Sequence, residues 1–285
     1  MPNKPNAGSE VTFAKQVSRV LNKHCVECHR AGEIAPFALT DYDEVIGWAD
    51  TMLESIEDNR MPPWHASNEH GVFSNARIMP TEDKQLLREW VTAGVPFGDP
   101  GDLPDLPAAV AGWQLPREPD LVLNMRARPF TVPATGTVDY QYFVVDPGFK
   151  EDKWIRMAQA LPGNRAVVHH ILVAVRPPGG RRKAGIGGGE FLVAYVPGLG
   201  ARVFPTGMTK FVPAGSKLIF QLHYTPIGSE QLDLSKLGLV YADPKDVKQV
   251  VYTTRAANHK FRIPPRDSNF RVYAETRGLP YDVQV

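Results

Sequence analysis

The chain of 285 residues contains only two cysteines, Cys25 and Cys28, and His29 follows the second one directly. Two cysteines this close together cannot join distant parts of a chain, so no disulfide framework holds the fold. The apolar share of 43% is that of an ordinary globular protein, so hydrophobic cores have to hold it instead. The spacing also places the two thiols and the imidazole on one tight turn of backbone.

A Cys-x-x-Cys-His segment is typical of c-type haem attachment, in which both thiols bond to the haem and the histidine binds iron. A zinc half-site would need another Cys or His pair, and His65 and His70 match that spacing poorly. A thioredoxin-like redox pair would follow a strand, whereas a helical pattern leads into Cys25. The sequence therefore predicts one covalent haem c on Cys25 and Cys28, with His29 as an axial ligand.

A c-type haem usually takes its sixth ligand, often a methionine, from a later loop. Met61 is favoured because two prolines follow it and stiffen that loop. Met79 and His65 remain as alternatives. Met52 is expected to lie on the second helix with its side chain in the hydrophobic core.

The hydrophobic pattern divides the chain into two parts. Helical periodicity predicts helices over 11–23, 40–58 and 81–93, with Thr40 and Thr81 as expected caps and His24 facing solvent. Residues 94–116 are rich in Pro and Gly and read as a linker. Short segments rich in β-branched and aromatic residues follow, separated by Gly/Pro turns, and this spacing is typical of an antiparallel sandwich or barrel. The Gly-rich residues 177–190 read as a hairpin loop.

Charge and hydropathy exclude several function classes. The net charge of +1 gives no reason to expect nucleic acid or an anionic membrane as a partner. No apolar run approaches the ~18 residues of a membrane span. The N-terminus has no apolar segment, so no signal peptide is present as written. Because haem c is attached outside the cytoplasm, we nevertheless expect a periplasmic or cell-surface protein.

Three histidines stand inside apolar segments of the β-rich part: His169 and His170 in "VVHHILVAV", and His223 in "IFQLHYTP". A buried histidine needs a hydrogen bond or a metal. Neighbours on a regular strand face opposite sides, so one of the pair would lie in the core unless the strand bulges there. Imidazole-only ligation would suit copper or a catalytic zinc, and a haem on the same chain favours the redox metal.

Residues 11 to about 99 resemble small class I cytochromes c in the order helix, Cys-x-x-Cys-His, helix, Met-Pro-Pro loop and closing helix with "LLREWV". The chain departs from them by a long insert at residues 64–80.

Residues 115 to about 255 resemble the first half of the copper type II, ascorbate-dependent monooxygenases. The features that carry the resemblance are the His169-His170 pair, "YVPG" (195–198), "VPAGSKLIFQLHYTP" (212–226) and the interval between the histidines. It implies that His169, His170 and His223 bind one copper, the electron-transfer copper of that family.

The two resemblances imply a multidomain α plus β protein. Its expected parts are a small all-α cytochrome c domain (1–99), a linker (100–116), a copper-binding, jelly-roll-like β-sandwich (117–255) and the start of a second, incomplete sandwich (256–285). In that family a second copper lies in the other half, which we expect to be missing here, so this chain alone should not hydroxylate. His259 reads as an ordinary strand residue.

The expected function is therefore that of an oxidoreductase module, which passes electrons from haem to copper. Its expected partners are an electron donor (a redox protein or a small reductant) and, in a full-length protein, molecular oxygen and an organic substrate. Two alternatives stay open: a non-catalytic electron-transfer or copper-binding protein, and a β-sandwich binding domain with an attached cytochrome.

Overall fold

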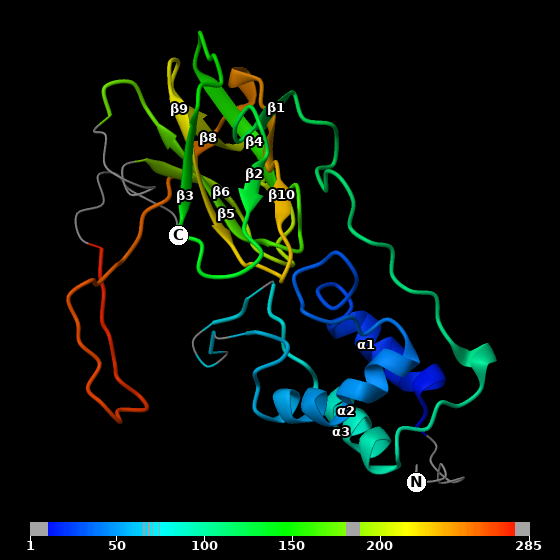
Figure 1. Cartoon of the computed structure of the whole chain (residues 1–285). Coiled ribbons are helices and arrows are strands. Elements are labelled where there is room, and N and C mark those ends of the chain that lie inside the picture. Colours follow the sequence, from blue (N-terminus) through cyan, green and yellow to red (C-terminus); the bar gives the residue numbers. More distant parts are fainter. Residues whose placement is uncertain are drawn as a thin grey trace.

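The computed structural model describes residues 11–64, 66–67, 69, 71–73, 75–180 and 189–276. Within these ranges all three α-helices end before residue 93, and every strand begins after residue 120 (Figure 1). The predicted order, a small helical part followed by a β-rich part, is therefore confirmed. None of the helices in these ranges has the length and apolar character needed to cross a bilayer.

The predicted helices agree with the observed ones to within two residues at each end. They are η1 and α1 as one continuous run (Phe13–Val17 and Ser18–His24), α2 (Tyr42–Glu57) and α3 (Thr81–Thr92). The cap of α2 is Asp41 and not Thr40, because the Asp41 carboxylate accepts a hydrogen bond from the Glu44 amide at 3.0 Å. Pro80 occupies the cap position of α3, so Thr81 is its first residue.

The helices enclose a hydrophobic core of their own, in which Trp90 is fully buried. The Trp90 indole donates a hydrogen bond to the Pro96 carbonyl at 3.0 Å, and the Phe13 amide donates to the same oxygen at 2.9 Å. The prediction that His24 faces solvent is wrong. Its side chain is 11% exposed and lies 2.8 Å from the Asp83 carboxylate. This contact ties α1 to α3 directly before the Cys-x-x-Cys-His turn.

The β-rich part consists of short strands separated by turns, as the sequence predicts. The strands are β1 (Leu121–Asn124), β2 (Phe130–Val132), β3 (Gln141–Val145), β4 (Lys153–Leu161), β5 (Val168–Arg176), β6 (Glu190–Tyr195), β7 (Arg202–Val203), β8 (Met208–Val212), β9 (Lys217–Tyr224), β10 (Gln231–Asp233), β11 (Lys236–Tyr241) and β12 (Gln249–Val250). Two single-turn 3-10 helices, η3 (Pro100–Asp102) and η5 (Pro244–Asp246), complete the elements in the described ranges.

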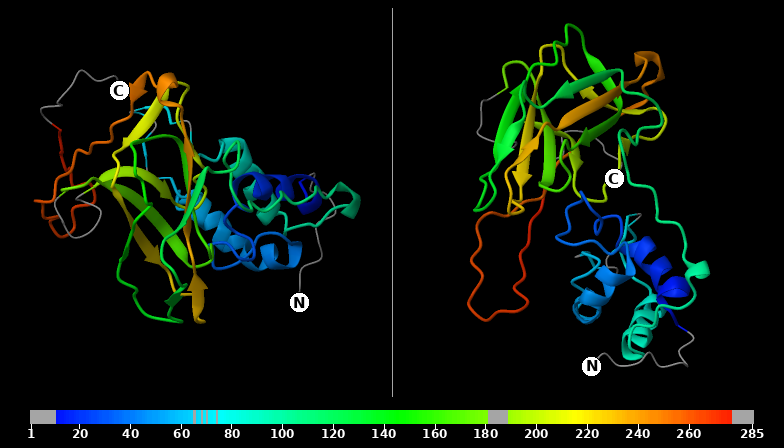
Figure 2. Two further views of the ribbon diagram at one scale, coloured as in Figure 1. Left: turned by 90° about the horizontal axis from the view of Figure 1, so that it is seen from above. Right: turned by 45° about the vertical axis from the view of Figure 1, so that its right-hand side comes forward.

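The strands form two larger sheets and one two-stranded pair. One sheet runs in the order β1-β11-β4-β8-β12 with β7 beside β4, the second in the order β3-β9-β5-β6, and β10 pairs with β2. All described pairs are antiparallel except β12 with β8. Apolar residues of both larger sheets form a single hydrophobic core, so the sheets lie face to face (Figures 1 and 2). The Gly-rich segment connects β5 and β6 as expected, although residues 181–188 lie outside the described residues.

The end of the predicted linker is part of the β-rich fold. Trp113 and Leu115 pack with Met157 of β4 and Val240 of β11. Gly238 of β11 makes room for this contact, because a Cβ there would lie 2.9 Å from the Trp113 ring. The free part of the linker is therefore shorter than residues 100–116.

The predicted second domain shows no strand over residues 256–276, the part of it that the structure describes. Two extended limbs run side by side there, because the Asn258 amide donates to the Tyr273 carbonyl at 2.9 Å (Figure 1). Their apolar side chains face solvent, with Tyr273 75% exposed. Two limbs without an apolar surface to cover are too few for a stable sheet. His259 lies in this segment and is exposed. The prediction that it is a strand residue is therefore wrong.

One buried carboxylate, Asp233, ties several loops of the β-rich part together. One of its oxygens accepts hydrogen bonds from the amides of Gly163 and Asn164, both at 2.9 Å, and the other accepts one from the Tyr224 hydroxyl at 2.8 Å. The Ser235 hydroxyl donates to both oxygens. A buried charge is tolerated only when it is satisfied in this way.

We predict that Asp233→Ala lowers the free energy of unfolding by at least about 2 kcal/mol, because it leaves several buried donors without an acceptor. Chemical denaturation followed by fluorescence measures the change. The exposed carboxylate of Asp139 provides the matched control, Asp139→Ala, which should change stability little. Equal stability of both variants would contradict the assigned role.

Candidate metal centres

The Cys-x-x-Cys-His segment forms one tight turn at the end of α1. The amides of Cys28 and His29 both donate to the Cys25 carbonyl, at 3.1 and 2.9 Å. Both cysteines are free and only partly exposed. The structure therefore confirms that Cys25, Cys28 and His29 lie on a single turn.

The His29 ring is oriented by its surroundings. Its Nδ1 lies 3.2 Å from the Phe37 carbonyl, so a proton on Nδ1 leaves the lone pair of Nε2 available to a metal. The ring packs on Phe37 at 4.7 Å between centroids, and Phe37 stacks on Trp48 at 4.0 Å. Burial lowers the pKa of His29, which favours the neutral form that binds metals.

The two thiols lack the properties of a redox-active pair. Burial, together with the charge of Cys28, raises the pKa of Cys25 to about 12, and burial raises the pKa of Cys28 as well. Reactive Cys-x-x-Cys pairs instead have lowered pKa values. A helix and not a strand precedes the turn. Both observations argue against the thioredoxin-like alternative.

The candidate sixth ligands occupy different environments. Met61 is 42% exposed in the loop after α2, whereas Met79 is 3% exposed inside the helical core. His65, and with it His70 of the zinc alternative, lies outside the described residues. Three residues after Met61 in the sequence, the indole Nε1 of Trp64 is buried with no hydrogen-bond partner among the described residues.

The three histidines of the β-rich part meet on the neighbouring strands β5 and β9. Val168 pairs with Tyr224 and His170 pairs with His223, so β5 has one residue more than β9 at this point. That extra residue is His169, and the register shift is a β-bulge. The bulge removes the strict alternation of side chains, and both neighbours therefore reach the same side as His223.

The resulting cluster has the dimensions of a metal site. One ligand atom from each of His169, His170 and His223 lies within 4.8 Å of the others. The Nδ1 atoms of His169 and His170 are 3.4 Å apart. Two nitrogens bound tetrahedrally to one metal at about 2.0–2.1 Å would be about 3.4 Å apart. Among the described residues, His169, His170 and His223 are the three metal-binding side chains close enough together to hold one ion.

The cluster is half-buried and contains no acid. His169 is exposed and the other two histidines are intermediate. Burial lowers the pKa of His170, and the nearby His223 and His169 lower it further; burial and His169 lower the pKa of His223. The lowered pKa values of His170 and His223 favour the neutral imidazole, which is the form that binds metals. Three imidazoles without a thiolate or carboxylate suit copper or zinc.

Aromatic and amide side chains that the sequence did not single out surround the cluster. The Tyr140 ring meets the rings of His170 and His223 edge-on, with centroids 5.6 and 5.0 Å apart. Gln221 of β9 donates to the Tyr142 hydroxyl at 2.7 Å. Since these contacts join residues that are far apart in the sequence, sequence spacing alone carries no signal for them.

A comparison with protein-family models and with curated proteins finds no match for this chain. The chemistry of both centres therefore has to be argued from the residues themselves.

We predict that the chain takes up one Cu²⁺ at the three-histidine cluster, and that His170→Ala abolishes stoichiometric uptake because it removes a central ligand. Metal analysis after dialysis measures the ratio of copper to protein. His259→Ala, which removes an exposed histidine elsewhere, is the matched control and should bind copper as the wild type does. Equal uptake by both variants would show that copper binds somewhere else.

Proposed function

We propose that this protein is a haem c- and copper-containing oxidoreductase module, in which a cytochrome c-like domain supplies electrons to a copper-binding β-sandwich. The observation that carries the proposal is the bulge at His169, which brings three imidazoles together on a chain that also holds a Cys-x-x-Cys-His turn. When bound, haem and copper supply one-electron redox chemistry. The proposed fold assignment follows the resemblance to class I cytochromes c and to the first half of the copper monooxygenases.

The residues of the helical part fit a covalent haem. Cys25 and Cys28 offer free thiols from one turn, and His29 offers Nε2 because its Nδ1 faces a carbonyl. The buried indole N–H of Trp64 has no partner among the described residues, so it can donate to an anionic group such as a haem propionate. These residues would bind the haem, orient it and shield it from water.

Met61 is the proposed sixth ligand. Its side chain is exposed, whereas the Met79 thioether is already enclosed among the apolar residues of the helical core. A thioether can bind iron only if it is free to approach it.

The residues of the β-rich part fit copper. His169, His170 and His223 would hold it through imidazole nitrogens, and Tyr140 would limit access of water from one side. We propose that this centre accepts electrons for oxygen-dependent chemistry, as the first copper of the resembling family does, and that the haem takes the place of ascorbate. A periplasmic or cell-surface location belongs to the same proposal, because haem c is attached outside the cytoplasm.

Quantification of haem and copper, combined with electron paramagnetic resonance, tests this function. One haem, one copper and Cu²⁺ hyperfine structure from three nitrogens would support it. Mixing the reduced haem form with Cu²⁺ should then oxidise the haem within the same molecule. A protein with haem and no bound copper would favour a binding domain with an attached cytochrome.

We predict that Met61→Leu removes the long-wavelength absorption band of methionine-ligated ferric haem, because it replaces the thioether with a hydrocarbon. Met79→Leu is the matched control and should retain that band, since leucine fills the buried site. The opposite pattern would make Met79 the ligand. Absence of the band already in the wild type would rule out a methionine ligand and point to His65.

A further inference from the structure

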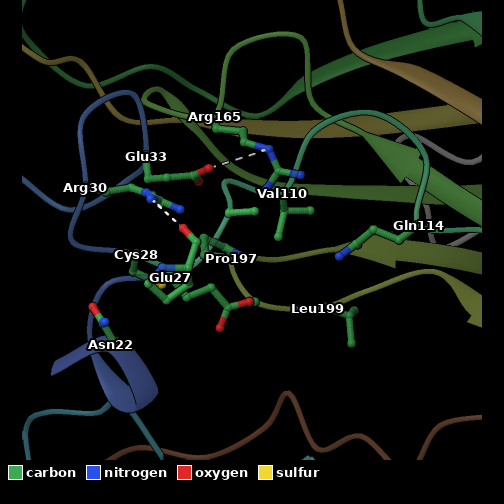
Figure 3. Close-up of a pocket in the computed structure, with 13 residues that line it drawn as sticks. Asn22, Glu27, Cys28, Arg30, Glu33, Val110, Gln114, Arg165, Pro197 and Leu199 are labelled. Carbon is green, nitrogen blue, oxygen red and sulfur yellow. Dashed lines mark hydrogen bonds and ion pairs between the residues drawn. The ribbon is translucent and has the colours of Figure 1, made fainter. Parts of the chain in front are cut away.

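The turn that carries Cys25, Cys28 and His29 lies against the β-rich part. We define residues 25–33 as the attachment loop and residues 195–200, directly after β6, as the β6 turn. A cavity of about 180 Å³ separates them, and its walls include Cys28 and Glu33 on one side and Arg165 and Leu199 on the other (Figure 3). A contact that is not filled by apolar side chains leaves two domains free to move unless other interactions hold them.

Arg77 provides one such interaction. One nitrogen of its guanidinium lies 2.8 Å from the Glu27 carboxylate of the attachment loop and 3.1 Å from the Gly198 carbonyl of the β6 turn. Gly198 has a φ of +78°, and a Cβ there would lie 1.6 Å from the same nitrogen. The absence of a side chain at residue 198 is thus what lets Arg77 reach both partners.

Arg165, in the loop between β4 and β5, provides a second interaction. It lies 3.8 Å from the Glu33 carboxylate of the attachment loop, and the two side chains are only 20% and 12% exposed (Figure 3). Its guanidinium also lies over the Tyr195 ring, 5.6 Å from the centroid. Ion pairs shielded from water lose less to screening than exposed ones.

The β6 turn leads directly to the three-histidine cluster. Tyr195, at the end of β6, pairs with Ile171 of β5, which is the neighbour of His170. Tyr195 is buried, and its hydroxyl has no hydrogen-bond partner among the described residues. Paired strands therefore connect the turn that meets Cys28 with the metal ligands.

We propose that Arg77 and Arg165 are positioning residues that hold the attachment loop on the β6 turn, and that this docked arrangement is the one in which electrons pass between the two centres. The electron-transfer part rests on the proposed function. In that step a ferrous haem loses one electron and becomes ferric, while Cu²⁺ held by the histidines becomes Cu⁺. No bond or proton is exchanged.

Hydrogen exchange on the full chain loaded with haem and copper tests the docking. Gly198→Ala should displace Arg77 and speed exchange in residues 26–33 and 195–200. The matched control is Gly148→Ala, which has a similar φ of +72° but open space around the added Cβ. The double variant Arg77→Gln/Arg165→Gln should raise opening of the interface by about two- to fivefold for each pair lost, whereas Arg117→Gln, which breaks an ion pair with Asp120 outside the interface, should not.

The rate of haem oxidation by copper within one molecule, measured after flash reduction, provides the second readout. The same variants should slow it while binding haem and copper in full. Unchanged exchange in Gly198→Ala and in the double arginine variant would overturn the docking role. Faster exchange with an unchanged rate would overturn the link to electron transfer. A wild type that transfers no electron would refute the proposed function, while the exchange result would still decide the docking.

Discussion

The buried Asp233 carboxylate holds two separate regions of the β-rich part in place. Through Tyr224 it fixes the end of β9 next to His223, and through the amides of Gly163 and Asn164 it fixes the loop that carries Arg165. A buried carboxylate is stable only with all of these donors in place, so the loops around it cannot move independently. The position of His223 and the contact made by Arg165 thus both depend on one polar group in the core.

The two centres are supported by different kinds of backbone. A helix end positions Cys25, Cys28 and His29, where hydrogen bonds to a single carbonyl close the turn. A bulged pair of strands positions His169, His170 and His223. In both places the backbone already holds the side chains close together. For the proposed function, this arrangement would limit the reorganisation that cofactor binding requires.

Local patterns in the sequence were sufficient for the helices, for most strands and for the histidines that meet in the three-histidine cluster. Periodicity placed α1, α2 and α3 closely because each helix buries one apolar face of its own. Contacts between segments that are distant in the sequence produce no such periodic pattern. The cap at Asp41, the role of Asp233 and the bridges of Arg77 and Arg165 depend on which loops meet in space. From the sequence, a bulge could be stated only as what the strand would need for both His169 and His170 to bind one metal. No residue type near His169 predicts that the bulge forms.

The bulge at His169 also makes the site sensitive to chain length. Because β5 has one more residue than β9 at this point, deletion of His169 would restore regular pairing without disturbing the strands on either side. The same fold would then present two of the three imidazoles and would lose the cluster in one step. A change in chain length at this one position would thus remove the three-histidine cluster while every other strand pair kept its register.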